Sequence, residues 1–451
     1  MYNIKNNSKK VLEGDTFVAI KGHTVDGHNY IEDAIKRGAK KIICEHGEYE
    51  VETVVVENSE KYITNYLVET YKDMLKEINF VGITGTNGKT TTCYLAYQML
   101  NKLGVKTAYI GTIGFYLDDF EEESLNTTPD IVMLYEYITK AYEAGFRNIV
   151  MEVCSHSLDL GRTEGINFEV GGYTNLTQDH LDYHKTMELY LETKKRLVPK
   201  CKKMVINGDD QYSKEFTNDN TLTVGFEDTN DIVVKQYENL IDGVKVNFTY
   251  NNENYEISPK VKGKYNITNF LMCIGICMEY KDINDIIAIS SEISAPKGRC
   301  ELISLNGGVA VVDYAHTPDA VQKIIDTFKE EKEGRIITVV GCGGDRDPVK
   351  RPIMGKIASD NSDYCIFTSD NPRTEDPKLI LEDVVRNVEK DNYEVQIDRT
   401  KAISSALDLI KENDKVLILG KGHEDYQIIG HEKIHMDDAQ IVRDYIKGKN
   451  N

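Results

Sequence analysis

The segment "VGITGTNGKTTT" at residues 81–92 constrains the fold more than any other part of this sequence. An apolar run suited to a buried parallel strand leads into a glycine-rich loop, and the loop opens a helix with a lysine and a threonine. That order is typical of a loop that binds phosphate groups at the N-terminus of a helix. The common form G-x-x-x-x-G-K-[ST] would place a glycine where this chain has Ile83. The glycines here are Gly82, Gly85 and Gly88, which indicates a different kind of ATP-using protein.

The order of apolar and polar stretches predicts an α/β protein with three domains, as expected for 451 residues. Residues 1–78 alternate short apolar runs with helix-compatible stretches, and predict a small α/β domain. Residues 79–297 predict a central P-loop ATPase domain with a parallel sheet covered by helices on both faces. Pro and Gly in "SAPKGR" place a boundary near 298, and residues 298–451 predict a doubly wound, Rossmann-like domain whose ligands bind after strand ends.

The charge balance and the cysteines limit the partners and the compartment. Lys+Arg 54 against Asp+Glu 74 gives a net charge of −20, so we expect neither nucleic acid nor an anionic membrane surface as a partner. There is no apolar signal region and no run of roughly 18 apolar residues for a membrane helix. The nine cysteines include no C-x-x-C pair, and Cys273 and Cys277, four apart on an apolar helix, are predicted core thiols. We expect a soluble, cytoplasmic monomer.

Several residues outside the glycines are candidates for phosphate and metal chemistry. Lys89 would reach the terminal phosphates, and the Thr90 hydroxyl would coordinate Mg²⁺. Glu152 ends the apolar strand "NIVME" and would be a second oxygen ligand, although an ordinary strand-end glutamate is the alternative. His180 beside phosphates could help a divalent ion, and imidazole suits Mn²⁺ better than Mg²⁺. His180 and His184 are four apart, as in a zinc helix, but the glutamate of H-E-x-x-H is missing.

These segments, taken in order, resemble the Mur ligases of peptidoglycan synthesis. The loop from Gly82 to Thr90 has the glycine spacing of that family, and Glu152, "TNLTQDHLDYH" and "YLETKKRL" follow it in the family's order. The resemblance implies that Lys194, four residues after Tyr190, is carbamylated and that the new carboxylate holds a second Mg²⁺. A carbamate would replace a cation near ATP with a hard oxygen ligand.

The resemblance covers almost the whole chain and implies further site residues. The residues expected to bind ATP are Gly85, Thr86, Asn87, Gly88, Lys89, Thr90, Thr91, Asn266, Asn269, Arg299, Asp313 and His316. The residues expected to face the UDP-muramoyl substrate are Ser8, His23, Thr24, Val25, Asn126, Thr127, Thr128, Cys154 and Arg162. The catalytic and metal-binding set is Lys89, Thr90, Glu152, His180 and Lys194.

Three motifs after residue 340 resemble the Mur ligase subfamily that adds the third residue of the stem peptide. They are "GGDRDPVKRPIM", "SDNPRTEDP" and "GKGHEDYQ", and D-N-P-R is the form of the diaminopimelate-adding members. Diaminopimelate ends in an amino-acid head whose carboxylate an arginine can bind bidentately, and lysine lacks that group. Taken alone, D-N-P-R would indicate only a turn before a helix. The candidate residues are Arg346 and Arg373 for the carboxylate, Asp370, Asn371 and Glu424 for the ammonium, and Pro372 and Gly420.

The sequence departs from the family pattern on the UDP-muramoyl side. Cys154 stands where the family usually has a serine, Leu160 where a glutamine is common, and Asn7-Ser8-Lys9 replaces the usual Asp-Ser-Arg. All of these changes affect residues expected to bind the peptide-nucleotide substrate. The motifs expected to bind ATP and the amino acid are intact.

The resemblance implies an ATP- and Mg²⁺-dependent amide ligase. It would join meso-diaminopimelate to the D-glutamate of UDP-N-acetylmuramoyl-L-alanyl-D-glutamate through an acyl phosphate, by positioning and charge neutralisation. Two alternatives stay open. A divergent paralogue could use another amino acid, such as L-lysine, or another carboxylate, and a nucleotide-gated binding protein could sense cell-wall precursors without ligating them.

Overall fold

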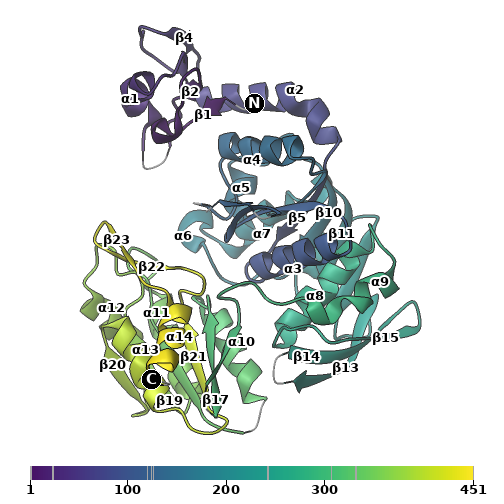
Figure 1. The fold of residues 1–451 in the computed structure, drawn as a ribbon, viewed down its shortest axis with the longest axis vertical. Coiled ribbons are helices and arrows are strands. Elements are labelled where there is room, and N and C mark those ends of the chain that lie inside the picture. Colours follow the sequence, from purple (N-terminus) through teal and green to yellow (C-terminus); the bar gives the residue numbers. More distant parts are fainter. Residues whose placement is uncertain are drawn as a thin grey trace.

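The computed structural model describes residues 3–22, 25–118, 120–122, 124, 126–240, 243–305, 307–330 and 333–449. Its strands form three main sheets within residues 4–55, 79–257 and 301–419, and we name the parts built on them the N-terminal, central and C-terminal units. Figure 1 shows these units and the long helix α2 (Ser59–Lys76) above the central unit. The predicted three-domain α/β architecture is confirmed, and the boundaries at 78/79 and 297/298 stay predictions.

The N-terminal unit is a small parallel sheet in the order β1-β2-β3-β4. Its elements are β1 (Ile4–Lys5), β2 (Thr16–Val18), α1 (Ile31–Lys36), β3 (Lys41–Cys44) and β4 (Glu52–Val55). Helix α2 then packs on α4 (Ile131–Glu143) of the central unit. Ile63 and Leu67, one turn apart on α2, are fully buried, as the helical spacing of apolar residues in this stretch predicts.

The central sheet has the order β15-β14-β13-β12-β11-β10-β5-β9-β6-β7-β8. The strands are β5 (Asn79–Thr84), β6 (Thr107–Gly111), β7 (Gly114–Leu117), β8 (Phe120–Glu122), β9 (Asn148–Glu152), β10 (Phe168–Tyr173), β11 (Cys201–Asn207), β12 (Thr221–Gly225), β13 (Ile232–Leu240), β14 (Gly243–Tyr250) and β15 (Glu253–Ile257). The predicted parallel sheet is present from β13 to β6 in this order. At both edges, β13–β15 and β6–β8 pair antiparallel, which the sequence did not predict. Antiparallel strands can leave one face of the sheet in water, so their apolar and polar residues are mixed, as in "IVVKQYENL". Such a sequence predicts a strand less clearly than the continuous apolar run of a buried parallel strand.

Helices cover both faces of the central sheet. They are α3 (Lys89–Lys102), α4, α5 (Ser155–Asp159), α6 (Leu181–His184), α7 (Met187–Lys195), α8 (Lys264–Cys277) and α9 (Ile283–Ala288). Strand β5 alternates between two cores: Phe80 packs with residues of α4, whereas Val81 and Ile83 pack with residues of α3 and α8. Cys273 and Cys277 are fully buried on α8, which confirms their prediction as core thiols.

The C-terminal unit has a sheet in the order β16-β17-β21-β18-β19-β20, parallel except for β16. Its elements are β16 (Glu301–Leu305), β17 (Gly308–Asp313), α10 (Pro318–Lys329), β18 (Ile336–Val340), α11 (Lys350–Asn361), β19 (Tyr364–Thr368), α12 (Pro377–Val385), β20 (Tyr393–Gln396), α13 (Arg399–Asp408), β21 (Lys415–Leu419), β22 (Tyr426–Ile429), β23 (Glu432–His435) and α14 (Asp438–Lys449). The predicted site motifs follow the carboxyl ends of β17, β18, β19 and β21. Among the described helices, none is long and apolar enough to cross a membrane.

Candidate active site

The glycines of the loop after β5 have separate physical causes. A Cβ on Gly82 would lie 2.5 Å from the Phe168 ring of the neighbouring strand, so this glycine serves sheet packing. A Cβ on Gly85 would lie 1.9 Å from Thr174 Oγ1. Gly88 has φ 87°, a left-handed conformation that favours glycine, at the N-cap of α3. The shifted spacing therefore follows from the packing of β10 against this loop.

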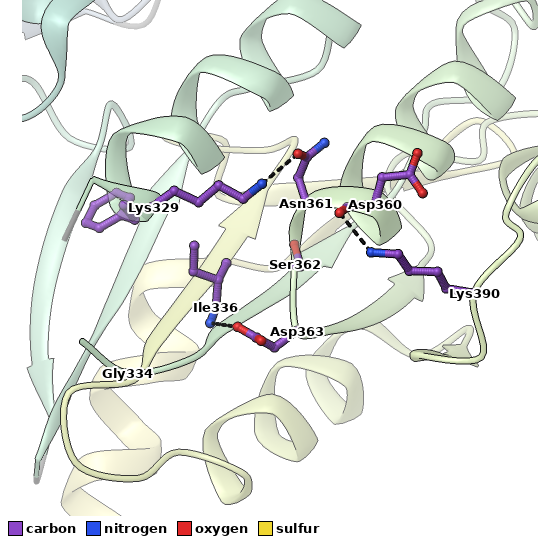
Figure 2. Close-up of a pocket in the computed structure, with 9 residues that line it drawn as sticks. Lys329, Gly334, Ile336, Asp360, Asn361, Ser362, Asp363 and Lys390 are labelled. Atoms are coloured by element: carbon purple, nitrogen blue, oxygen red, sulfur yellow. Dashed lines mark hydrogen bonds between the residues drawn. The ribbon is translucent and has the colours of Figure 1, made fainter. Parts of the chain in front are cut away.

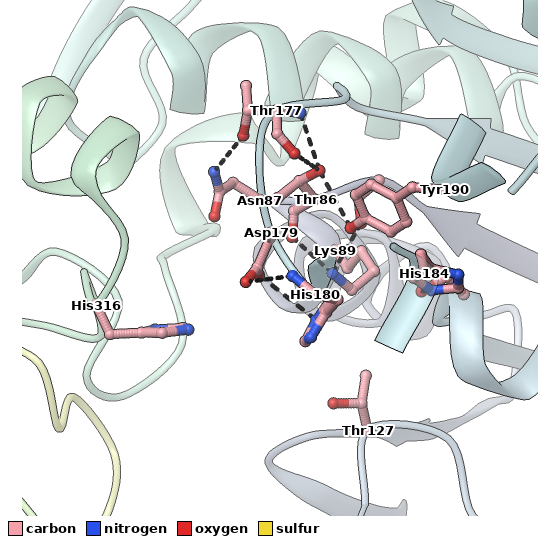
Figure 3. Close-up of polar contacts among 12 residues, drawn as sticks. Thr86, Asn87, Lys89, Thr127, Thr177, Asp179, His180, His184, Tyr190 and His316 are labelled. Carbon is pink, nitrogen blue, oxygen red and sulfur yellow. Dashed lines mark hydrogen bonds and ion pairs between the residues drawn. The ribbon is translucent and has the colours of Figure 1, made fainter. Parts of the chain in front are cut away.

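The loop is held in shape by its own lysine and by the segment after β10. Lys89 Nζ donates to the carbonyl oxygens of Gly85 and Thr86 at 2.9 and 2.7 Å. Asn87 N donates to Asn175 Oδ1 at 3.0 Å. Figure 3 shows Lys89 curled beneath Thr86 and Asn87. The backbone amides that would hold phosphate are thus preorganised before any ligand binds.

Glu152 is fully buried at the end of β9 and is surrounded by donors. Its Oε2 accepts from Thr90 Oγ1 at 3.0 Å and from Thr112 Oγ1 at 3.1 Å. Its Oε1 accepts from the Tyr109 hydroxyl at 2.8 Å and from Thr112 N at 2.7 Å. The two predicted metal-binding residues Thr90 and Glu152 therefore lie together. Tyr109 and Thr112 were not predicted, because their partner is some 40 residues away in the sequence.

The chemistry of this pair fits a magnesium ion. Mg²⁺ prefers hard oxygen ligands, takes one or two carboxylates and keeps several waters. The Thr90 hydroxyl and the Glu152 carboxylate are such oxygens, 3.0 Å apart. Within the described residues, no three His, Cys, Asp or Glu side chains come together as a metal site.

Lys194 on α7 is buried against the same loop. Its side chain is 1% exposed, its Nζ donates to the Gly85 carbonyl at 2.8 Å, and it lies 4.7 Å from the centre of the Tyr190 ring. Gly85 O thus accepts from both Lys194 and Lys89. Burial, and next the charge of Lys89, hold the pKa of Lys194 well below its usual value. The neutral amine is therefore favoured more at Lys194 than at a solvent-exposed lysine.

The two histidines four residues apart face different neighbours. His180 has a left-handed φ of 54°, and its ring meets that of His156 edge-on at 5.0 Å. The side chain of His180 is 46% exposed, and partial desolvation lowers its pKa against the opposing charge of Asp179. His184 is buried and its Nε2 is 2.8 Å from Ser155 Oγ. Figure 3 shows His180 beside Lys89, with His184 farther away. The pair therefore does not form the face of a zinc helix.

The C-terminal unit reaches the nucleotide loop through Arg299. Its Nη2 donates to Thr90 Oγ1 at 3.3 Å, and the guanidinium lies 4.4 Å from the centre of the Tyr314 ring. Its Nε is buried and has no hydrogen-bond partner among the described residues. An arginine beside the predicted metal pair, with a donor still to be satisfied, suits a phosphate.

Asp313 and His316 form the turn after β17. Asp313 accepts from Cys300 N at 2.6 Å and from Ala315 N at 2.8 Å, so it shapes this turn. Burial raises the pKa of Asp313, and burial followed by the Lys350 charge lowers that of His316. Figure 3 shows His316 across from the loop. The next helix adds a second link between the units, because Asn87 Nδ2 donates to Asp319 Oδ2 at 3.0 Å.

Two predicted asparagines lie on α8 against the loop. A Cβ on Gly88 would lie 2.9 Å from Asn269 Oδ1. Asn269 Nδ2 donates to Asn266 Oδ1 at 3.2 Å, and Asn266 Nδ2 donates to the Lys262 carbonyl at 2.9 Å. Both side chains are buried, in line with a place beside a bound nucleotide.

The predicted carboxylate clamp lies on the loops after β18 and β19. Arg373 has a left-handed φ of 51°, and its Nη1 donates to the Gly344 carbonyl at 2.8 Å. A Cβ on Gly343 would lie 3.0 Å from Arg373 Nη1 and 3.8 Å from Arg346 Cγ. The two arginines thus flank one glycine loop, and Arg346 is exposed.

The predicted ammonium-binding residues lie beside this clamp. Asn371 Nδ2 donates to Glu424 Oε2 at 2.8 Å. Gly420 has φ 117°, and a Cβ there would lie 2.7 Å from Asp370 Oδ2. Asp370, Asn371 and Pro372 are buried at the end of β19. The groups predicted to bind the carboxylate and those predicted to bind the ammonium therefore meet at one edge of the sheet.

Comparisons with known proteins agree with this arrangement. Three family models match: Mur ligase family, catalytic domain, at residues 1–87; Mur ligase middle domain, at 83–277; and Mur ligase, glutamate ligase domain, at 298–422. The chain is 42% identical to the UDP-N-acetylmuramoyl-L-alanyl-D-glutamate–2,6-diaminopimelate ligase of Clostridium botulinum, over 98% of this chain and 95% of that protein. The chain belongs to the Mur ligase family. It is therefore an ATP-dependent amide ligase by family.

Solved structures of other Mur ligases share the fold. A UDP-N-acetylmuramoyl-L-alanyl-D-glutamate–2,6-diaminopimelate ligase superimposes with a TM-score of 0.67 at 29% identity, covering 100% of this chain and 96% of its own. The MurF ligase of Thermotoga maritima in complex with ADP gives a TM-score of 0.74 at 20% identity, covering 100% of this chain and 98% of its own.

In this Mur ligase, three residues expected on the UDP-muramoyl side lie together near Glu152. Thr128 Oγ1 donates to the Glu152 carbonyl at 2.8 Å and accepts from Cys154 N at 3.1 Å. Arg162 Nη1 donates to the Thr128 carbonyl at 2.9 Å. Cys154 is half-buried.

The other residues expected on that side are more scattered. The hydroxyl oxygens of Thr127 and Thr112 are 3.1 Å apart, and Asn126 is exposed. Ser8 is buried and Val25 is 53% exposed in the N-terminal unit. His23 and Thr24 lie outside the described residues.

A hollow of ≈ 310 Å³ in the C-terminal unit lies away from all these residues. Figure 2 shows it lined by Lys329, Ile336, Asp363 and Lys390. Ile336 begins β18 and Asp363 precedes β19, so the hollow is at the amino ends of the strands. Open α/β sheets bind ligands at the carboxyl ends, and we assign no role to this hollow in the reaction.

Proposed function

We propose that this Mur ligase adds meso-diaminopimelate to UDP-N-acetylmuramoyl-L-alanyl-D-glutamate, with ATP and Mg²⁺. One observation carries the proposal: the chain resembles, over 98% of its length, a ligase of that name. The local geometry supports it, because the nucleotide loop and the Arg373 turn are on different units that meet at Arg299 and Thr90.

The geometry supports an acyl-phosphate route that needs no protein nucleophile. The substrate carboxylate attacks the γ-phosphorus of ATP and ADP leaves; the free amine then attacks the acyl carbon and phosphate leaves. The loop amides and Arg299 would neutralise the phosphates, and the Arg373 turn would orient the amine. Thr90 and Glu152 would hold Mg²⁺, which supplies Lewis-acid neutralisation of phosphate charge. Closure of the C-terminal unit would exclude water.

We also propose that Lys194 carries a carbamate. The neutral amine attacks CO₂, a N–C bond forms and a proton leaves, so the product is a carboxylate. The buried site and the nearby Lys89 favour the neutral amine, because both lower the pKa of Lys194. The carbamate would supply the further oxygen ligand for a second Mg²⁺, and His180 stays a candidate for a divalent ion. Mass spectrometry of the intact protein at neutral pH should show the mass of one added CO₂, lost on acidification. A spectrum of the unmodified lysine alone would contradict the proposal.

The experiment that tests the function is phosphate release from ATP. The purified protein is mixed with the UDP-dipeptide and, in turn, meso-diaminopimelate, L-lysine and a panel of other amino acids. We expect release and a UDP-tripeptide product with diaminopimelate, and none in a Lys89→Met variant. Phosphate release only with another amino acid would favour the divergent paralogue. The departures from the family pattern at Cys154 and Leu160 are the reason to keep this alternative. Binding of the nucleotide substrate without release would favour the sensing protein.

A further inference from the structure

Lys421 is a buried ammonium inside the amino-acid-binding motif. Its side chain is 0% exposed, and its Nζ donates to Glu424 Oε2 at 2.9 Å and to Asn371 Oδ1 at 3.2 Å. It also lies 5.3 Å from the centre of the Tyr426 ring. Burying an ammonium is costly unless it is paired and hydrogen-bonded, so this arrangement is a built feature of the turn after β21.

Lys421 engages the two residues expected to bind the substrate's ammonium. Glu424 receives both of its described side-chain hydrogen bonds, from Lys421 and Asn371, on Oε2. Oε1 therefore has no partner among the described residues and can accept from a ligand. Asn371 Oδ1 also accepts from Ile428 N at 2.9 Å. The lysine thus fixes the orientation of the carboxylate and leaves one oxygen for the substrate.

The charges near this turn give the lysine a second effect. Asp370 and Glu424 are two carboxylates at one sheet edge, and Lys421 neutralises one of them. One negative charge would then remain for the ammonium of an incoming amino acid, and Arg373 and Arg346 would face its carboxylate. Without Lys421 the two carboxylates would favour a substrate end that carries only an ammonium.

We propose that Lys421 is a specificity-determining residue: its ammonium balances Glu424 so that the site selects a zwitterionic amino-acid head over a lone ammonium. This inference rests on the proposed function and deepens it. The selected class is diamino acids whose far end carries both an ammonium and a carboxylate, and the rejected class is simple diamines and lysine.

The test is the ratio of kcat/KM for meso-diaminopimelate to that for L-lysine. In Lys421→Met the KM for diaminopimelate should rise roughly 10- to 150-fold, the range for one hydrogen bond to a charged group. The kcat/KM for lysine should not fall, so the ratio should drop by roughly 10- to 150-fold. Lys421→Arg keeps the charge and should recover part of the ratio. The KM for ATP should not change.

Two further variants keep the test decisive. Lys415 is also a buried lysine, at the opposite end of β21, and donates to the Glu333 carbonyl. Lys415→Met should lower stability without changing the ratio. Combining Lys421→Met with Glu424→Gln removes both charges, leaves no orphan ion, and should restore part of the ratio if charge balance sets it. This double variant also serves if Lys421→Met does not fold.

The outcomes separate the two proposals. A wild type that ligates diaminopimelate, together with a Lys421→Met ratio equal to that of wild type, would overturn this inference and leave the proposed function standing. A wild type that ligates no diaminopimelate would overturn the proposed function and this inference with it.

Discussion

Lys194 in the central unit and Lys421 in the C-terminal unit are both buried at the candidate site, and their partners differ. Lys194 donates to the Gly85 carbonyl, and burial and then the Lys89 charge lower its pKa. Lys421 is equally buried but has the Glu424 carboxylate at 2.9 Å. A buried ammonium keeps its charge beside a carboxylate and loses it beside neutral or cationic groups. Within the described residues, Lys194 therefore lacks the carboxylate partner that Lys421 has.

The difference shows how one residue type serves two tasks in one enzyme. In the central unit Lys194 donates to a backbone carbonyl, so this lysine can change its covalent state without losing an ion pair. In the C-terminal unit the charged side chains hold one another in place. Under the two proposals, the first arrangement would serve the chemistry and the second the selection of the amino acid.

The largest expected effect is at Lys194. Lys194→Ala should reduce ligation on the order of 1000-fold, because a lost metal-holding carboxylate removes several kcal/mol of charge stabilisation. Short carboxylates added to the assay should restore part of the activity, and Lys194→Arg should stay inactive because arginine forms no carbamate. Steady-state phosphate release is the measurement. Lys195→Ala is the matched control, since its ion pairs with Glu192 and Glu215 are at the surface. A fully active Lys194→Ala variant would show that Lys194 has no role in the reaction, and the proposed difference between Lys194 and Lys421 would then be wrong.

Arg373 should give the next largest effect. A bidentate arginine–carboxylate contact, worth roughly 1.5–3 kcal/mol, corresponds to about 10- to 150-fold in KM for diaminopimelate. Arg373→Ala should show that loss with an unchanged KM for ATP. Arg373→Lys should recover little, as an ammonium cannot reproduce the planar fork. Equal losses for lysine and diaminopimelate would show that Arg373 does not contact the distinguishing carboxylate.

A smaller effect is expected at Tyr109, whose hydroxyl donates a hydrogen bond to the Glu152 carboxylate. Tyr109→Phe removes the 2.8 Å hydrogen bond to Oε1 and should weaken divalent-metal binding by about tenfold, the lower range for such supporting partners. Mn²⁺ binding measured by electron paramagnetic resonance, in the presence of ADP, is the readout. Tyr97→Phe, in the same aromatic cluster, is the control. Equal Mn²⁺ affinities for the two variants would make Tyr109 a packing residue only.

Sequence patterns were sufficient to predict the parts of the site that are formed by residues close together in the chain. The strand before the loop, the glycine turn and the helix from Lys89 follow from residues adjacent in the chain. Glu152 was found because it ends an apolar strand, and parallel strands share a carboxyl edge. The side-by-side placement of Thr90 and Glu152 needed only that β5 and β9 pair, as they do.

Other parts depend on partners far away in the sequence. Tyr109 lies in the apolar run "TAYIG" and gave no sign that its hydroxyl meets Glu152, 43 residues later. Lys421 lies in a polar motif, and nothing adjacent in the sequence indicated that its side chain is buried. Its partner Asn371 is 50 residues earlier in the chain. The antiparallel edges of the central sheet were missed for a similar reason, since half-solvated strands have a mixed pattern.

The turn that carries Arg373 is joined to the β22–β23 hairpin as well as to its own strand. Arg373 N donates to the Ile428 carbonyl at 3.0 Å, and Gly430 N donates to the Arg373 carbonyl at 2.7 Å. The two segments are more than 50 residues apart in the chain and are joined by these backbone hydrogen bonds. To transfer a substrate preference between relatives, by recombination or by design, both segments should therefore be exchanged together. A variant that receives D-N-P-R alone would lack the strand whose hydrogen bonds orient Arg373.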